Sequence, residues 1–206
     1  MNSHTEIMYA FDLLGTVAFA ASGALAGVRR RMDLLGVIVL GIVTATGGGV
    51  VRDLLLYDTP PFCFKNELYL YLALAASIVV FLTPRSFERM RRAMLLLDAL
   101  GLGTFLVIGT SKALAFHLGF MGAVIMGVMT ATCGGLIRDV LSNEIPLILQ
   151  REIYASACVA GGALFYLLYH AAVPTATNLT VSALVVITIR CAAILKGWEL
   201  PRGKAA

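Results

Sequence analysis

Long apolar runs alternate with short polar connections along almost the whole chain. Most runs have about 20 residues, the length a helix needs to cross the roughly 30 Å hydrocarbon core of a bilayer. The pattern therefore predicts an all-α integral membrane protein with seven transmembrane helices. The predicted spans cover residues 7–28, 34–57, 67–83, 94–116, 120–141, 153–171 and 178–195.

The chain contains an internal repeat with an offset of 86 residues. The sequence TATGGGVVRD at residues 44–53 returns as TATCGGLIRD at residues 130–139, with Cys133 in place of the first glycine. The same offset relates further pairs of identical residues, among them Asp12 and Asp98, Gly23 and Gly109, and Pro60 and Pro146.

The repeat predicts that spans one to three are duplicated as spans four to six, with the seventh span unpaired. Because each unit has an odd number of spans, the two copies must cross the membrane in opposite senses, as in an inverted-topology repeat. We expect a first three-helix repeat at residues 1–83, a second, inverted repeat at 84–171, and a seventh helix with a cytoplasmic tail at 172–206.

Composition and charge place the protein in a membrane rather than on nucleic acid. The chain is 59% hydrophobic with a mean hydropathy of +0.88, and its net charge of +4 comes from basic residues that cluster between apolar runs. On one side the connections and tail hold eleven Lys and Arg residues, and on the other they hold one, Lys65. The positive-inside rule then predicts an N-terminus outside and a cytoplasmic C-terminus.

No pattern typical of an enzyme or a metalloprotein stands out. The four cysteines, at 63, 133, 158 and 191, have no CxxC spacing, and no nucleophile–base pair is evident. We therefore expect no disulfide, no metal centre formed by side chains, no cofactor, no nucleic-acid partner and no enzymatic activity.

The two glycine motifs are predicted to break the second and fifth helices near the bilayer midplane. Each glycine lowers helix stability by roughly 1 kcal/mol relative to alanine, and irregular backbone at that depth is tolerated only where it is buried in protein or lines a water-filled cavity. Backbone carbonyls at Gly48 and Gly134 could then face a monovalent cation. The predicted kink residues are Gly47, Gly48, Gly49, Cys133, Gly134 and Gly135.

Charged residues inside the spans form the second part of the predicted site. Arg52 and Arg138 should flank the midplane from opposite sides, and each should pair with an acid on another helix, since intramembrane charges are costly when unpaired. Asp12 and Asp98 are the leading partners. The candidate pore-lining or gating residues are Arg52, Asp53, Arg138, Asp139, Asp12, Asp98, Lys112, Thr44, Thr46, Thr130 and Thr132.

Each of these features also has a purely structural interpretation. The glycines could serve tight helix packing, and the Arg–Asp pairs could form ion-pair networks at helix ends. Asp12 could be an interfacial residue, the threonines could bond back to the preceding turn, and Lys112 and Arg190 could extend their charged groups to the membrane surface.

The motifs ATGGGVVRD at 45–53 and ATCGGLIRD at 131–139, together with Pro60, Pro146 and the 3+3+1 span pattern, resemble the trimeric intracellular cation (TRIC) channel family, specifically its prokaryotic branch. The resemblance implies a homotrimer in the plasma (inner) membrane of a prokaryote. It also implies one pore per protomer, bounded by the second and fifth helices, that passes K⁺ and other monovalent cations such as Na⁺.

Two other functions stay open at this point. The duplicated glycine-rich domain also resembles bacterial membrane proteins assigned to glycine transport, so a secondary transporter of a small zwitterion is the alternative. A membrane scaffold that conducts nothing is the third.

Overall fold

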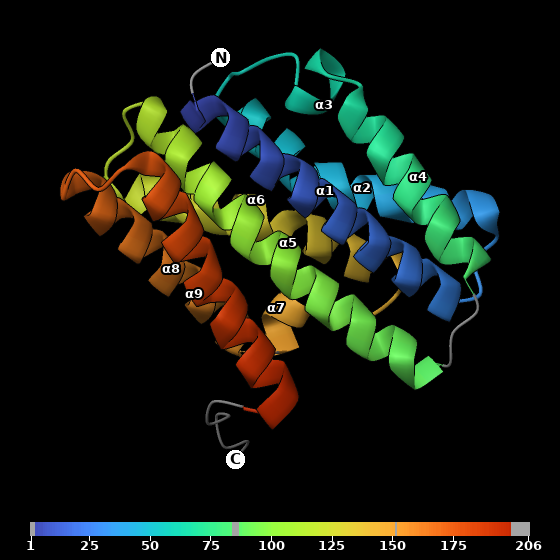
Figure 1. Cartoon of the computed structure of the whole chain (residues 1–206). Coiled ribbons are helices and arrows are strands. Elements are labelled where there is room, and N and C mark those ends of the chain that lie inside the picture. Colours follow the sequence, from blue (N-terminus) through green and yellow to red (C-terminus); the bar gives the residue numbers. More distant parts are fainter. Residues whose placement is uncertain (1–2, 84–86, 151, 199–206) are drawn as a thin grey trace.

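The computed structural model describes residues 3–83, 87–150 and 152–198, and this part of the chain is helical (Figure 1). An all-helical membrane protein is therefore confirmed. In chain order the helices are α1 (Ser3–Arg29), α2 (Leu34–Leu55), α3 (Phe62–Lys65), α4 (Leu68–Leu82), α5 (Phe87–Ala115), α6 (Phe120–Leu141), α7 (Leu147–Gln150), α8 (Glu152–His170) and α9 (Thr175–Lys196).

Within the described residues, six helices are long and apolar enough to cross a membrane, namely α1, α2, α5, α6, α8 and α9. The predicted third span corresponds to α4, which has 15 residues. At about 1.5 Å of rise per residue, α4 is shorter than the roughly 30 Å hydrocarbon core, so the count of seven spans stays a prediction. The short helices α3 and α7 follow α2 and α6 and were not predicted from the apolar pattern.

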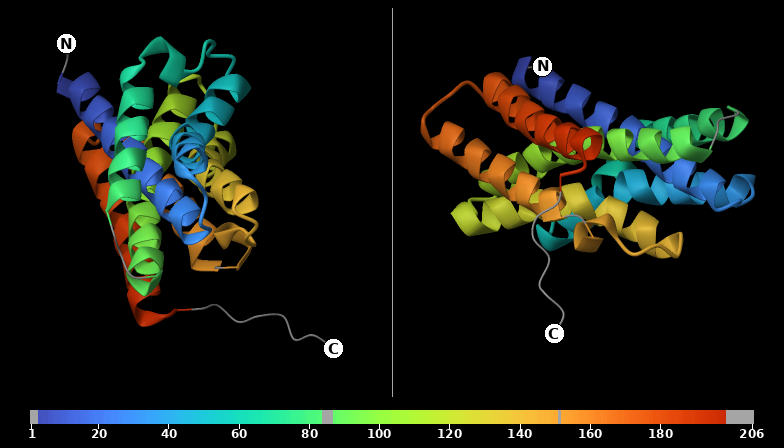
Figure 2. Two further views of the ribbon diagram at one scale, coloured as in Figure 1. Left: turned by 90° about the vertical axis from the view of Figure 1, so that its right-hand side faces the viewer. Right: turned by 90° about the horizontal axis from the view of Figure 1, so that it is seen from below.

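By the sequence repeat, we group the long helices into a first unit (α1, α2 and α4) and a second unit (α5, α6 and α8), with α9 outside the repeat. In the first unit α1 packs against α2 and α4, and in the second α5 and α8 pack against α6. Across the interface α1 lies along α5, and α2 lies along α6, while α9 covers α5 and α8 (Figures 1 and 2). The repeat-related helices α2 and α6 therefore meet at the centre of the molecule.

The expected breaks in these two central helices are not confirmed. Both α2 and α6 run as single α-helices through their glycines. The glycines instead permit close contact between the helices: a Cβ at Gly48 would lie 2.1 Å from the carbonyl oxygen of Thr130, and one at Gly134 would lie 2.2 Å from that of Thr44. Tight packing compensates for the low helix propensity of glycine, so the backbone does not need to unwind.

The same threonines also pack against the first helix of their own unit. A Cβ at Gly23 of α1 would lie 2.4 Å from Oγ1 of Thr44, and one at Gly109 of α5 would lie 2.5 Å from Oγ1 of Thr130. Small residues therefore let three helices converge on each threonine, as is common where membrane helices approach closely.

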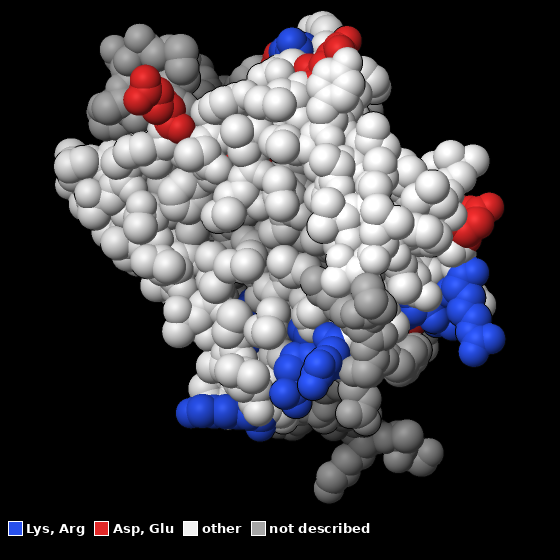
Figure 3. Space-filling view, turned by 45° about the vertical axis from the view of Figure 1, so that its right-hand side comes forward, with Lys and Arg blue, Asp and Glu red and all other residues white. Residues whose placement is uncertain are grey.

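The outer surface has the charge distribution of a membrane protein. Figure 3 shows a broad belt of uncharged side chains, with charged groups toward the two ends of the molecule and Lys and Arg gathered at the end where α9 finishes. Large exposed hydrophobic side chains such as Leu14, Val79 and Leu184 contribute to the uncharged surface.

Candidate functional site: two polar networks beside the α2–α6 contact

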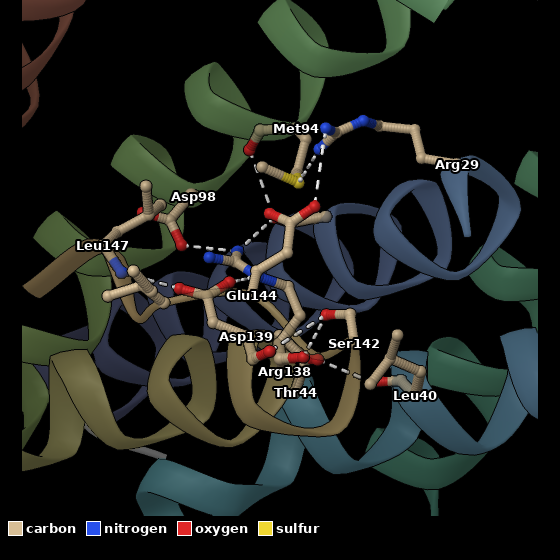
Figure 4. A network of polar contacts seen from close by, with 12 residues as sticks. Arg29, Leu40, Thr44, Met94, Asp98, Arg138, Asp139, Ser142, Glu144 and Leu147 are labelled. Carbon is tan, nitrogen blue, oxygen red and sulfur yellow. Dashed lines mark hydrogen bonds and ion pairs between the residues drawn. The ribbon is translucent and has the colours of Figure 1, made fainter. Parts of the chain in front are cut away.

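A buried cluster of charges surrounds Arg138 near the end of α6 (Figure 4), and we call it the Arg138 network. The Arg138 side chain is fully buried. Its Nη1 donates to Oδ1 of Asp98 on α5 at 2.7 Å, and its Nε donates to Oδ1 of the adjacent Asp139 at 2.8 Å. Nη1 also donates to the hydroxyl of Ser22 on α1 at 2.7 Å. The network thus joins α1, α5 and α6.

A second cluster, which we call the Arg52 network, lies at the corresponding position of α2. Arg52 Nε donates to Oδ1 of Asp53 at 2.7 Å, and Lys112 Nζ, from the last turn of α5, donates to the same oxygen at 2.7 Å. Lys112 also reaches Asp58, which pairs in addition with Lys65. The structure therefore brings together Arg52, Asp53 and Lys112, which the sequence marked as candidates.

Both Arg–Asp pairs use neighbouring residues, which was not expected. Consecutive residues of a helix point about 100° apart, and each arginine was predicted to reach an acid on another helix instead. Arg138 does reach Asp98, but the structure gives Arg52 no hydrogen bond to Asp12. The long arginine side chain lets Nε bond to the next residue, and the two Nη atoms remain available for other partners.

Asp12 and Asp98, the acids on the first helix of each unit, have different hydrogen-bond partners. Asp98 accepts from Arg138 at 2.7 Å and from the hydroxyl of Tyr154 on α8 at 3.4 Å. Asp12 accepts from the hydroxyl of Tyr69 on α4 at 3.0 Å. Each acid therefore meets a tyrosine from the third long helix of its own unit, but Asp98 alone is directly bonded to the network arginine.

Asp53 and Asp139 also fix the loop that follows each central helix. Oδ2 of Asp53 accepts from the backbone N–H of Phe62 at 2.8 Å, and Oδ2 of Asp139 accepts from that of Leu147 at 2.8 Å. These N–H groups open the short helices α3 and α7, where carboxylates are favoured by the unpaired donors and the helix dipole. The Arg-Asp motif thus has a structural role in both copies.

Each central helix ends so that a second acid turns back toward the neighbouring helices. Tyr57 and Asn143 have positive φ, 56° and 53°, and the next residue donates its N–H to the carbonyl of Asp53 or Asp139, a common way for helices to end. That next residue is Asp58 in the first unit and Glu144 in the second. Glu144 pairs with Arg30 at 3.0 Å and lies 3.6 Å from Arg29.

The pKa of Asp58 is lowered to about 2 by its hydrogen bonds to Lys112 and Lys65. The carboxylate form is therefore the species that binds the two lysines throughout the physiological pH range.

The candidate threonines bond along their own helices. The hydroxyls of Thr44, Thr46 and Thr130 each donate to the carbonyl four residues earlier, at 2.6, 2.8 and 2.7 Å. This is the back-bonding interpretation of these residues. Thr132 is buried like the others. Cys133 and Gly47, which occupy equivalent positions in the two copies, are both half-buried.

Both networks contain buried polar atoms without a hydrogen-bond partner among the described residues. In the Arg52 network these are Nη1 of Arg52 and Oδ1 of Asp12, and in the Arg138 network Nη2 of Arg138 and Oδ2 of Asp98. Buried polar groups in proteins are nearly always hydrogen-bonded to protein or water. The arrangement thus provides an unused donor and an unused acceptor on each side of the α2–α6 contact.

Several residues of the networks carried no signal in the sequence. Ser22, Tyr69 and Tyr154 lie in apolar runs without a motif, although the hydroxyl of each could have suggested a bonding role. Arg190 was expected to extend to the membrane surface, but it is buried at 3% exposure and stacks on the ring of Tyr154 at 4.7 Å. The expectation was wrong because the side chain lies where α9 packs against α8.

The chain is similar in sequence to bacterial membrane proteins. The family model described as glycine transporter matches residues 9–85 and 95–170. The UPF0126 inner membrane protein YadS of Escherichia coli is 43% identical over 197 residues, which cover 95% of each chain.

Solved structures of similar sequence have the same fold. A structure from work on conductance through TRIC cation channels is 43% identical, with a TM-score of 0.86, and the match covers 96% of this chain and 97% of that one. A TRIC channel orthologue from Rhodobacter sphaeroides is 37% identical, with a TM-score of 0.88 and coverage of 93% and 99%.

Proposed function

This chain belongs to the family of the prokaryotic TRIC channels and the UPF0126 bacterial membrane proteins, and we propose that it is a cation channel permeable to K⁺. Each protomer of a homotrimer contains one pore, which runs beside the contact between α2 and α6. The permeant ions are K⁺ and Na⁺, and the protein needs no cofactor.

The observation that carries this proposal is the pair of polar networks on either side of the α2–α6 contact. A charge inside a membrane protein normally pairs or faces a water-filled cavity. Arg52 pairs with Asp53, and Arg138 pairs with Asp139. A water-filled cavity is favoured by the polar atoms that have no partner among the described residues, because water in a hydrated path would bond to them. These atoms belong to Arg52, Asp12, Arg138 and Asp98.

The acids of these networks favour cations over anions. Rings or clusters of Asp and Glu are typical of cation pathways. Both arginines are neutralised by adjacent aspartates, so their charge need not block a cation, while Asp12 and Asp98 each retain a free carboxylate oxygen. In this proposal the acids attract the ion, and the arginines set how far each end opens.

Recordings from purified protein in planar bilayers test the proposal. We expect unitary currents whose reversal potential, in a KCl gradient, lies near the K⁺ equilibrium potential, and we expect Arg52→Ala and Arg138→Ala to change their conductance or open probability. Arg92→Ala, at an exposed position of α5, is the control and should leave the currents unchanged. Silent bilayers across voltages, or reversal near the Cl⁻ potential, would overturn the proposal.

The membrane arrangement forms part of the same proposal. The inverted repeat and the distribution of Lys and Arg support seven spans, with α4 as the third, an N-terminus outside and a C-terminus in the cytoplasm. The inner membrane of a bacterium is the expected location, as for the E. coli relative. Accessibility of single introduced cysteines before α1 and after α9 to a membrane-impermeant reagent tests the orientation.

The glycine-transporter description of the matching family model supports a second candidate, a secondary transporter of a small zwitterion. A free guanidinium N–H beside a carboxylate could bind the two charges of glycine. Saturable glycine uptake into proteoliposomes, in a preparation that gives no unitary currents, would favour the transporter. Currents without uptake would favour the channel.

A further inference from the structure

Arg190 has no equivalent in the inverted repeat, because it belongs to the unpaired helix α9. Its position is nevertheless fixed. The side chain is buried, stacks on Tyr154, and donates from Nη1 to the carbonyl of Ile153 at 3.2 Å. Ile153 has a backbone conformation outside the helical region (φ −77°, ψ 25°), so Arg190 satisfies a carbonyl at an irregular turn.

The stacked tyrosine connects Arg190 to the Arg138 network. The hydroxyl of Tyr154 donates to Asp98, and Asp98 accepts from Arg138. Arg190 Nε has no hydrogen-bond partner among the described residues. Arg190 also lines a cavity of about 210 Å³ together with Arg29, Arg91 and Glu144. The guanidinium therefore lies between this cavity and the buried network.

Arg190 adds a buried positive charge at the Arg138 end of the molecule. Within the repeats, each network has three basic and three acidic side chains. The first contains Arg52, Lys65 and Lys112 with Asp12, Asp53 and Asp58, and the second contains Arg29, Arg30 and Arg138 with Asp98, Asp139 and Glu144. Arg190 is a further buried basic side chain outside both of these sets, and it lies at the Arg138 end, where the exposed Arg91 also lines the cavity.

We propose that Arg190 is a fixed positive charge that makes the cation current rectify, by lowering the local K⁺ concentration at the Arg138 end of the pathway. This inference rests on the proposed channel function. A buried unit charge produces a potential that low-dielectric walls focus into the adjacent cavity. The local K⁺ concentration is therefore lower at the Arg138 end than at the Arg52 end, where the network has equal numbers of basic and acidic side chains.

The expected effect is moderate and depends on salt. At about 0.1 M salt the Debye length is about 10 Å, comparable to the size of the cavity, whereas at about 1 M it is about 3 Å. For an effective dielectric constant between those of water and protein, one charge at roughly 8–10 Å changes the local cation concentration by about 1.5- to 3-fold. The larger and smaller currents at opposite voltages should differ by a similar ratio in dilute KCl.

Single-channel recordings in symmetric KCl test the proposal. The measured quantity is the ratio of the larger to the smaller current at equal and opposite voltages, which does not depend on the orientation of the inserted channel. We expect about 1.5 to 3 for the wild type at 0.1 M KCl and a value near one at 1 M. R190Q should lower the ratio toward one at 0.1 M, whereas R190K, which keeps the charge, should retain the wild-type ratio.

Arg92→Gln is the matched control, because it removes the same charge from an exposed position of α5 that does not line this cavity. It should keep the wild-type ratio. A wild-type ratio of one at 0.1 M, a ratio unaffected by salt, or an R190Q ratio equal to that of the wild type would overturn the inference and leave the channel proposal intact. A wild type without unitary currents would overturn both. If R190Q does not fold, R190M tests the same loss of charge with an apolar side chain.

Discussion

Gly48 of α2 lies directly against the carbonyl oxygen of Thr130 on α6, so closely that a Cβ would come within 2.1 Å of that oxygen. Its repeat partner Gly134 has the same relationship to Thr44. Backbone is the group that cannot move away, so these two glycines determine how closely the central helices pack.

Gly48→Ala should therefore destabilise the protein. Overpacking of a close contact costs typically about 1–3 kcal/mol, and we expect a loss in the upper part of that range because the obstructing atom belongs to a helix backbone. Thermal unfolding of the purified protein in detergent measures the effect. Gly162→Ala in α8 is the control: the nearest atom to its Cβ would lie at 3.4 Å, an ordinary contact. Equal unfolding temperatures for the two variants would contradict this account of the α2–α6 contact.

Asp98→Asn should cost much more stability than Asp12→Asn, although the two acids are repeat-related. Asp98 is bonded directly to the buried Arg138, and removal of one partner of a buried ion pair costs about 3–5 kcal/mol. Asp12 is bonded to Tyr69, a bond an asparagine oxygen can still accept. The free energies of unfolding of the two variants, measured under identical conditions, should differ by at least about 1.5 kcal/mol. Similar losses would mean that the two networks are equivalent.

Ser22→Ala should weaken the Arg138 network without breaking its ion pairs. The Ser22 hydroxyl accepts from Arg138 and donates to the carbonyl of Met94 at 3.1 Å, and a hydrogen bond to a charged group is worth about 1.5–3 kcal/mol. Ser77→Ala is the control, since that buried hydroxyl donates within its own helix, to Ala73. The unfolding temperature should fall further for Ser22→Ala. A larger fall for Ser77→Ala would show that the cross-helix bond contributes little.

The contribution of Asp58 to stability should depend on pH only in strong acid. Its pKa is lowered to about 2 from the usual 3.8 by Lys112 and Lys65, so its stabilising effect is complete above the unfolded-state pKa and is lost as the pH falls through the folded value. The difference in unfolding temperature between wild type and Asp58→Asn should stay constant from pH 7 to 5. It should shrink as the pH falls below about 4 toward 2. A difference that disappears already between pH 7 and 5 would contradict the assignment.

The repeat made the architecture predictable from the sequence. Identical residues spaced by 86 positions imply identical local structure, and α2 and α6 indeed begin and end at equivalent residues. Arg52 and Arg138 each have an acidic partner in the structure, as expected of a charge in an apolar run.

Other features depended on neighbours that the sequence does not specify. A glycine lowers helix propensity whether it unwinds the helix or packs against another, and the presence of Thr130 opposite Gly48 decides between the two. Whether Arg190 extends to the membrane surface or is buried depends on whether its face of α9 contacts lipid or protein. Arg52 and Arg138 share the two glycines before them and the aspartate after them, yet only Arg138 bonds to the acid on the first helix of its unit.

The loop acids at the ends of the central helices have a consequence for the independence of the two halves. Asp58 of the first unit forms an ion pair with Lys112 of the second. Glu144 of the second unit forms ion pairs with Arg29 and Arg30 of the first. Each half thus supplies a counter-charge for an acid of the other, although Asp58 also pairs with Lys65 of its own half. The single chain acts here as a covalent tether, which keeps two mutually dependent partners at fixed stoichiometry in the membrane.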